Sequence, residues 1–425
     1  MGATFSDRTT RQSVAQGGIG VQAQSGPDDV DDNLDLTDPA AFVDHDPYAY
    51  WERMRRLQPV RWHPPKEHRP GFWAVARYGD VLACYKDTAR LSSARGTVLD
   101  VLLAGGDSAG GRMLAVMDSP RHRDLRQVLL RAFSPRVIHG VEQTVRRRAD
   151  DLVAAIVGAG AIDAATSIAE HLPINTICDL LEIPGADRPA LLAWNKRALS
   201  SDTGNEDRHD ALEARSEILS YFVDIIRDRR RNPGDDVISL IAQADVLGEP
   251  MTEDDIALNC YSLILGGDES TRVSIIGGLH ALGTFPDQWC LLKDGGATVS
   301  TAVEEVLRWV TPAMHFARTA STDLRIGDAQ VGAGEIVTLW NISANNDDTV
   351  FSNPRRFDVA RADNPHLALG YGPHYCLGAF LGRMELNAVL DSLVRRVATL
   401  QVLEAPQRIH SNFLFGYSAL RLRLD

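Results

Sequence analysis

Helical periodicity dominates the pattern of hydrophobic and polar positions along the chain. In several long segments apolar residues recur every three or four positions, the spacing that gathers them on one face of a helix. These segments are about 137–158, 187–200, 208–230, 253–284, 298–310 and 377–397, and shorter helical patterns cover 48–57 and 80–86. The sequence therefore predicts a mainly helical protein.

Strand-like patterns are short and few. One covers 71–76, and two more, 324–326 and 335–340, lie late in the chain. The regular alternation of strands and helices that is typical of a doubly wound parallel sheet is absent. The predicted fold class is mainly α with a minor β portion.

The first 38 residues differ in composition from the rest. They are rich in Gly, Gln, Ser and Asp, and they contain too few apolar residues to offset the entropy of ordering. We interpret 1–38 as a flexible N-terminal tail. Because no internal repeat and no Pro/Gly-rich linker follows, 39–425 is predicted to be a single domain.

Charge and cysteine content narrow the function. The net charge of -13, from 57 acidic and 44 basic residues, disfavours a nucleic-acid binder, which needs a surplus of cations. The five cysteines are scattered without a CxxC pair, which excludes zinc-ribbon and dithiol sites and suggests a reducing compartment. The longest apolar stretch, 152–162, falls short of the 18 or more residues of a membrane helix. We expect a cytoplasmic protein without a membrane span.

The strongest chemical signal lies at 369–378, which reads LGYGPHYCLG and leads into a helix. The unpaired amides and the dipole at a helix start favour a thiolate at Cys376, and three glycines let the backbone approach a flat partner. Such a thiolate is a metal or haem-iron ligand or a nucleophile. The alternative is a buried, inert cysteine between turn glycines.

This segment resembles the signature of the cytochrome P450 family, F-G-x-G-x-H/R-x-C-x-G. Gly370, Gly372, His374, Cys376 and Gly378 all fall in frame, and the departure is Leu369 where Phe is usual. The resemblance extends over nearly all of 39–425. It implies the cytochrome P450 fold and a soluble, bacterial-type haem-thiolate monooxygenase, in which Cys376 ligates the iron of haem b (iron protoporphyrin IX).

The helix predicted over 253–284 contains Gly266 and Gly267, followed by Asp268, Glu269, Ser270 and Thr271. Each glycine inside a helix costs about 1 kcal/mol relative to Ala, so the pair indicates a close-lying ligand or a kink packed against a neighbour. The segment also resembles the family pattern A/G-G-x-D/E-T. That resemblance implies that Glu269 and Ser270 relay protons, with Thr271 as a second candidate hydroxyl.

A structural motif of the family is the E-x-x-R helix. Glu305 and Arg308 are three residues apart and can pair on a helix face, although such pairs are usually surface decoration. The resemblance implies instead a buried brace, completed by an arginine of a P-x-R-F segment. Residues 354–357 match that segment and nominate Arg356.

The two propionates of haem need cations and hydrogen-bond donors. Residues 118–126 are similar to the family segment D-P-P-x-H-x-x-x-R, which nominates His122 and Arg126. By the same resemblance Arg318 and His374 also contact the propionates.

The expected partner is an electron donor. Residues 121–136 hold five arginines, Arg121, Arg123, Arg126, Arg131 and Arg136, against one acid, Asp124, so five minus one leaves +4. The resemblance implies that an acidic ferredoxin or flavodoxin docks here, favoured by electrostatic attraction. The alternative is a solvated helix face.

A rival function comes from the G-x-S-x-G match at 106–110, which would make Ser108 the nucleophile of a serine esterase. None of the 12 histidines precedes a Gly-Gly pair of an oxyanion motif, and residues 118–120 interrupt the required helix. We interpret 95–115 as a Gly-rich flexible loop over a pocket. A second alternative is a P450-like haem protein that performs coupling or recruitment without monooxygenation.

The substrate is expected to be a small, lipophilic natural-product intermediate. This expectation rests on family analogy and on apolar residues in regions that line the pocket in relatives: Leu99, Leu103, Met113, Trp194, Leu263, Ala313, Met314, Phe413 and Leu414.

Overall fold

The computed structural model describes residues 34–131, 135–199 and 208–425. Most of the predicted tail over 1–38 lies outside these residues. Its last residues do not fit the prediction, because Leu34 and Leu36 are buried and pack with Phe42 and Trp51 in one hydrophobic cluster. The folded part of the chain therefore begins before residue 39.

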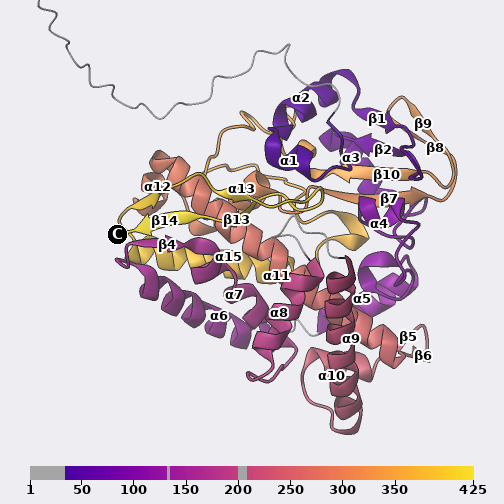
Figure 1. Ribbon diagram of the computed structural model, residues 1–425, viewed down its shortest axis with the longest axis horizontal. Coiled ribbons are helices and arrows are strands. Elements are labelled where there is room, and N and C mark those ends of the chain that lie inside the picture. The colour runs from indigo at the N-terminus through magenta and orange to yellow at the C-terminus, as the bar shows by residue number, and fades with distance from the viewer. Residues whose placement is uncertain (1–33, 132–134, 200–207) are drawn as a thin grey trace, which may run out of the picture. The chain divides into compact units, whose positions relative to one another are not determined.

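The helices bear out the predicted segments within a few residues and add several more (Figure 1). In chain order they are α1 (Ala40–Asp44), α2 (Pro47–Leu57), α3 (Tyr78–Lys86), α4 (Leu99–Leu103), η1 (Leu114–Val116), α5 (Arg121–Arg131), α6 (Pro135–Ile156), η2 (Ala165–Ala169), α7 (Leu172–Leu180), α8 (Arg188–Leu199), α9 (Arg208–Arg231), α10 (Val237–Ala242), α11 (Glu253–Thr284), α12 (Pro286–Lys293), α13 (Val299–Val310), α14 (Asn341–Ala344), η3 (Gly372–His374) and α15 (Ala379–Arg396). The mainly α fold class is confirmed.

The strands are short, as predicted. They are β1 (Val60–His63), β2 (Phe72–Val75), β3 (Leu91–Ser92), β4 (Ala161–Asp163), β5 (Asp245–Val246), β6 (Glu249–Pro250), β7 (His315–Ala320), β8 (Leu324–Ile326), β9 (Ala329–Val331), β10 (Ile336–Trp340), β11 (Leu400–Val402), β12 (Gln407–Arg408), β13 (Tyr417–Ala419) and β14 (Arg421–Leu424). The largest sheet has the order β1-β2-β10-β7-β3, with β2 and β10 parallel and the other neighbours antiparallel. A doubly wound parallel sheet is thus excluded for this sheet.

Helix α11 is the longest helix of the described chain, and it packs against α7, α8, α9, α13 and α15. Its start is well specified by the sequence. The hydroxyl of Thr252 accepts the Asp255 backbone N–H, and three acidic residues occupy the first turn, where the helix dipole favours negative charge. Because α11 touches so many elements, residues on its different faces meet quite different surroundings.

The main hydrophobic core lies where α6, α7, α11, α13 and α15 pack together. A second cluster joins α1, α2 and α4 to the large sheet. None of the helices in the described part of the chain is both long and apolar enough to cross a membrane.

Two predicted features need correction in the light of this fold. The segment 95–115, expected to be a loop, contains α4 and the first residues of η1. Strand β7 was not predicted, because five of its six residues are buried and the strand lacks the apolar-polar alternation that marks a half-exposed strand.

Candidate active site

Cys376 lies on a tight loop between η3 and α15. Gly370 and Gly372 have φ of 68° and 72°, the left-handed region that favours glycine. A Cβ atom on Gly372 would also lie 2.9 Å from the carbonyl oxygen of Tyr85. The Cys376 N–H donates to the carbonyl of Leu369 at 2.9 Å, which closes the loop.

The environment of the Cys376 thiol contains opposing influences. Burial is the largest influence and raises the pKa of the Cys376 thiol above its ordinary value, and the Gly378 N–H and the cations Arg126 and Arg383 offset this rise only in part. The sequence predicted that the start of the following helix would favour a thiolate at Cys376. In the structure this contribution comes from the Gly378 N–H, since α15 begins three residues later at Ala379. A Cβ on Gly378 would meet nothing within 4 Å, so the space beside the cysteine is open.

Four basic side chains from three different elements gather beside Cys376; we call Cys376, His122, Arg126, Arg318 and His374 the Cys376 cluster. The imidazole rings of His122 and His374 lie 4.1 Å apart between centroids. Arg126 donates to the carbonyl oxygen of Tyr375 at 2.6 Å, and Arg318 donates to the carbonyl oxygen of Ala317 at 2.8 Å. These residues are up to 254 positions apart in the sequence, from His122 to Cys376, and the fold brings them together.

The Cys376 cluster lacks an anion. Arg318 is only 3% exposed, and burial lowers the pKa of Arg318 and of Arg126. Burial, with a further contribution from Arg126, lowers the pKa of His122 to about 4, and the Nε2 atom of His122 has no hydrogen-bond partner. Within the described ranges neither Arg126 nor Arg318 forms an ion pair with a carboxylate.

The charge of Asp118 opposes the lowering of the pKa of His122 and of Arg318, but the two oxygens of Asp118 accept hydrogen bonds from Ser92 and Ser93. Four basic side chains without a carboxylate partner, of which His122 and Arg318 are buried and Arg126 and His374 half-buried, match a dianionic group. The propionates of a haem are such a group, and the residues present fit them.

The middle of α11 carries two residues with open surface, Gly266 and Ser270. Gly266 is exposed although it lies in the middle of the longest helix, and a Cβ there would meet nothing within 4 Å. The Ser270 hydroxyl donates to the Gly266 carbonyl at 3.3 Å and has part of its surface open. Gly267 serves another purpose, because a Cβ there would lie 3.2 Å from Ile177 of α7.

The other predicted relay residues are engaged elsewhere. Glu269 forms a buried ion pair with Arg272 on the next turn. Thr271 is buried and points towards α15, where its hydroxyl lies near Gly382 and lowers the pKa of Glu385. The structure therefore brings Ser270 to the open side of α11 and turns Thr271 to the opposite side.

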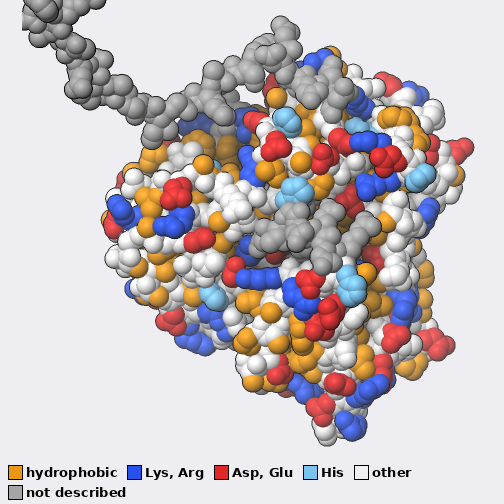
Figure 2. Space-filling view, viewed as in Figure 1, with side chains coloured by type: hydrophobic (Ala, Val, Ile, Leu, Met, Phe, Trp, Pro, Cys, Tyr) orange, Lys and Arg blue, Asp and Glu red, His pale blue; other side chains and the backbone are white. Residues whose placement is uncertain are grey.

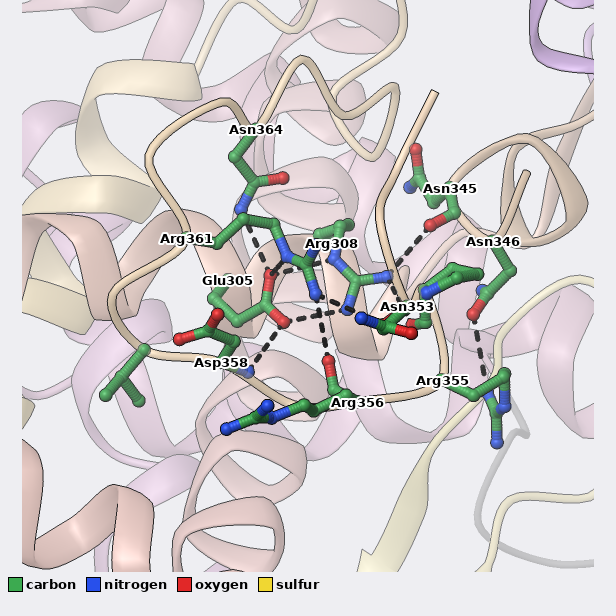
Figure 3. Close-up of polar contacts among 12 residues, drawn as sticks. Glu305, Arg308, Asn345, Asn346, Asn353, Arg355, Arg356, Asp358, Arg361 and Asn364 are labelled. Carbon is green, nitrogen blue, oxygen red and sulfur yellow. Dashed lines mark hydrogen bonds and ion pairs between the residues drawn. The ribbon is translucent and has the colours of Figure 1, made fainter. Parts of the chain in front are cut away.

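Glu305 and Arg308 form the buried pair that the E-x-x-R pattern predicted. Both are 0% exposed, and the two side chains make two hydrogen bonds of 2.8 Å (Figure 3). Arg308 also donates to the carbonyl oxygens of Asn345 and Pro354. The surface-pair alternative is thus wrong.

The third member of this group is Arg361 and not Arg356, as the sequence had nominated. The Nε atom of Arg361 donates to Glu305 at 2.9 Å, whereas Arg356 is exposed and contributes its carbonyl oxygen to Arg361 (Figure 3). Asn364 and the Asp358 N–H complete the donors to Glu305. We call Glu305, Arg308, Asp358, Arg361 and Asn364 the Glu305 cluster. The sequence assigned no role to Arg361, since this residue lies outside the P-x-R-F segment over 354–357.

The predicted basic face over 121–136 is weaker than its sequence suggests. Arg121 forms an ion pair with Asp255 of α11, and Arg126 points inward to Tyr375. Arg123 and Arg131 are exposed, and the Arg136 side chain lies outside the described residues. On the face in Figure 2 basic and acidic side chains are intermixed.

The esterase alternative fails on geometry. Ser108 lies in a turn between α4 and η1, so neither the strand before it nor the long helix after it exists in this part of the chain.

Comparisons with known proteins agree with this site. A family model described as cytochrome P450 matches residues 298–416, which include Glu305 and Cys376. Cytochrome P450 NovI of Streptomyces niveus is 41% identical over 393 residues, which cover 92% of this chain and 97% of that protein. A steroid C26-monooxygenase of Mycobacterium tuberculosis is 32% identical over 398 residues, 90% of each chain.

Among solved structures, the crystal structure of P450 OxyD, which is involved in the biosynthesis of vancomycin-type antibiotics, has a TM-score of 0.84 and 33% identity. The match covers 92% of this chain and 99% of that one. The similarity therefore spans both the Glu305 cluster and the Cys376 cluster.

Proposed function

Because the chain belongs to the cytochrome P450 family and is a monooxygenase of that family, we propose that it holds haem b through Cys376 and oxidises a small, lipophilic natural-product intermediate. The observation that carries this proposal is the Cys376 cluster, in which four basic side chains, two of them fully buried, lie near a cysteine and form no ion pair with a carboxylate. The two haem propionates supply the missing negative charge.

In this proposal the chain does three things for the cofactor. His122, Arg126, Arg318 and His374 bind the propionates, and Gly370, Gly372 and Gly378 let the loop lie close to a flat ring. Cys376 provides the thiolate ligand. When bound, haem supplies the activation of dioxygen and the transfer of one oxygen atom to the substrate.

Ser270 is the hydroxyl best placed to move a proton, because it alone of the predicted relay residues lies on the open side of α11. Glu269 is the second member of the proposed relay, and it exchanges a proton only when its ion pair with Arg272 loosens. Thr271 receives no role in the chemistry, since its hydroxyl faces α15.

The lipophilic substrate class is supported by the way apolar segments converge. Ala313 and Leu414 form a β-bridge, the Met314 N–H donates to the carbonyl of Phe413, and the Leu99 N–H donates to His315. Three of the predicted lining segments thus lie against one another. The similarity to NovI and OxyD favours a natural-product intermediate over a nutrient.

The electron donor in this proposal is a ferredoxin or flavodoxin that works with the enzyme in the cytoplasm. Support comes from cations and exposed rings around the haem loop: Arg123 lies one turn before Arg126, and Tyr371 and Phe380 are exposed on either side of Cys376. Reduction of the enzyme by each donor at rising salt concentration tests this, and a rate that does not fall with salt would argue against electrostatic docking.

The test of the proposed function is spectroscopic. The purified protein, reduced under carbon monoxide, should show the strongly red-shifted Soret band of a thiolate ligand. Cys376→Ser should lose that band, whereas Cys290→Ser, at an exposed cysteine, should keep it. A band that survives Cys376→Ser would show that another residue ligates the iron.

A further inference from the structure

Helices α8 and α11 are joined by one buried polar contact, between Asn195 and Asp268. The Nδ2 atom of Asn195 donates to Oδ2 of Asp268 at 2.6 Å. Asn195 is 0% exposed and Asp268 is 3% exposed. Neither residue belongs to the relay pair or to the Cys376 cluster.

One oxygen of each side chain has no hydrogen-bond partner. Oδ1 of Asn195 and Oδ1 of Asp268 are both buried and both lack a hydrogen-bond partner. Both atoms are acceptors, and an ionised carboxylate has no hydrogen to give. A single proton on Asp268 creates the one donor that both oxygens lack, and the two side chains then share a pair of hydrogen bonds, as a carboxylic acid and an amide do.

The surroundings of Asp268 favour that proton. The charged and titratable groups that face this part of the molecule are Glu269 and Arg272 on α11, Lys196 on α8, Glu170 after η2, Cys178 and Asp179 on α7, Arg148 on α6 and Glu385 on α15. The cations are already engaged, since Arg272 pairs with Glu269, Lys196 with Glu170 and Arg148 with Asp179. Burial and the charge of Glu269 raise the pKa of Asp268 to about 7, although the Asn195 hydrogen bond and the charges of Arg272 and Lys196 oppose the shift.

We propose that Asp268 is protonated when α8 is closed on α11, that it forms a neutral acid-amide pair with Asn195, and that its ionisation releases α8. Asn195 follows Trp194, a predicted pocket residue, and Asp268 follows the glycine pair that opens α11. The pair is thus a positioning device for one wall of the proposed pocket. Only this last consequence rests on the proposed function.

The direction of the pH effect follows from proton linkage. Asp268 has a pKa of about 7 in the closed state, and a solvated aspartate titrates near 3.8. Opening of α8 therefore releases a proton between these values, so the opening constant rises by up to about tenfold per pH unit below pH 7 and levels off above it. Mild acidification holds α8 more tightly.

Hydrogen exchange of the haem-containing full chain, measured by mass spectrometry without substrate or reductant, tests this. Peptides from 188–199 are followed from about pH 5.5 to 8, with rates corrected for intrinsic exchange. The wild type should open three- to tenfold more per unit in the lower half of this range. Asp268→Asn, which keeps the shape and cannot ionise, should show no such slope.

Two further variants keep the test decisive. Asn195→Ala removes the partner, so α8 should already be as open at about pH 5.5 as the wild type becomes near pH 7. Lys196→Gln, the matched control on α8, should retain the slope. A flat wild-type profile, or a slope that persists in Asp268→Asn, would overturn the proposal, and loss of the slope in Lys196→Gln would assign it to the Lys196–Glu170 pair. Because the carbon monoxide spectrum reports the proposed function separately, the two ideas fail independently.

Discussion

The Glu305 cluster and the Cys376 cluster both bury charged side chains, but they do so in opposite ways. Glu305 accepts hydrogen bonds from Arg308, Arg361, Asn364 and the Asp358 N–H. In the Cys376 cluster the two arginines donate only to carbonyl oxygens, Arg318 also lies over the ring of Tyr85, and a ring nitrogen of His122 has no hydrogen-bond partner.

The difference shows which of the two clusters has all its charges compensated once the chain has folded. A buried charge that is hydrogen-bonded on all sides has already recovered its lost hydration, so the Glu305 cluster is finished by the chain alone. In the Cys376 cluster the chain does not compensate the arginines for their lost hydration, and a bound group of opposite charge does so.

The largest effect on stability should come from a substitution in the Glu305 cluster. Glu305→Ala leaves Arg308 and Arg361 buried without their acid, which should cost about 3–5 kcal/mol in the free energy of unfolding and give haem-poor protein. Denaturant unfolding and haem content measure this. Unchanged stability would mean that the cluster contributes little.

A matched pair of arginines sharpens the same point. Arg361→Ala should destabilise the protein, whereas Arg356→Ala, which keeps the backbone carbonyl and removes an exposed side chain, should change the unfolding free energy by less than about 0.5 kcal/mol. The reverse result would return the third position to Arg356.

In the Cys376 cluster a substitution should have opposite effects on the haem-free and the haem-containing protein. Arg318→Met removes a buried, uncompensated cation, so the haem-free protein should gain about 1–2 kcal/mol of stability. The same variant should release haem faster, because a propionate loses its partner. Melting of both forms and haem transfer to an acceptor protein give the two readings, and destabilisation of both forms would contradict the idea.

His122 should make the haem-free protein sensitive to acid. Its pKa falls from an ordinary 6.5 to about 4 on folding, so the unfolded chain binds the extra proton and stability is lost as the pH falls from 6.5 towards 4. His122 contributes at most about 1.4 kcal/mol per pH unit to the slope. His122→Phe should remove the share of His122 from the slope, whereas His63, His280, His315 and His374, whose pKa values burial also lowers, keep the rest. Bound haem should reduce the share of His122 as well, because its propionates favour the protonated ring.

The smallest effect on folding belongs to Ser270. Its hydroxyl bonds only to the carbonyl of its own helix, so Ser270→Ala should leave melting and haem content nearly unchanged. Product formed per reductant consumed should nevertheless fall, with hydrogen peroxide rising in its place. Thr271→Ala should show the converse, a loss of stability with coupling retained, because its side chain packs on α15. If coupling collapses only in Thr271→Ala, the relay belongs to that residue.

The sequence predicted what local pattern controls. The helices with strong periodicity, such as α6 and α13, were predicted within a residue or two, and the loop around Cys376 stood out because its glycines are required locally. Helix α7 was not predicted, because seven of its nine residues are buried and it has no polar face to mark its period.

Long-range pairing was beyond the reach of the sequence. Arg356 and Arg361 lie on the same loop, and only the course of the backbone decides which guanidinium reaches Glu305. The contact between Asn195 and Asp268 spans 73 positions and carries no motif at all.

The adjacent glycines of α11 have a consequence for how the enzyme can change over evolutionary time. One residue along a helix turns the side chain by about 100°, so neighbours in sequence answer to different selective pressures. A side chain at position 267 would press on Ile177, so this substitution would lower the stability of any later variant, whatever its substrate. A side chain at position 266 would meet no atom of the chain within 4 Å, so a substitution there would act on what the site binds and could change its specificity with little effect on packing.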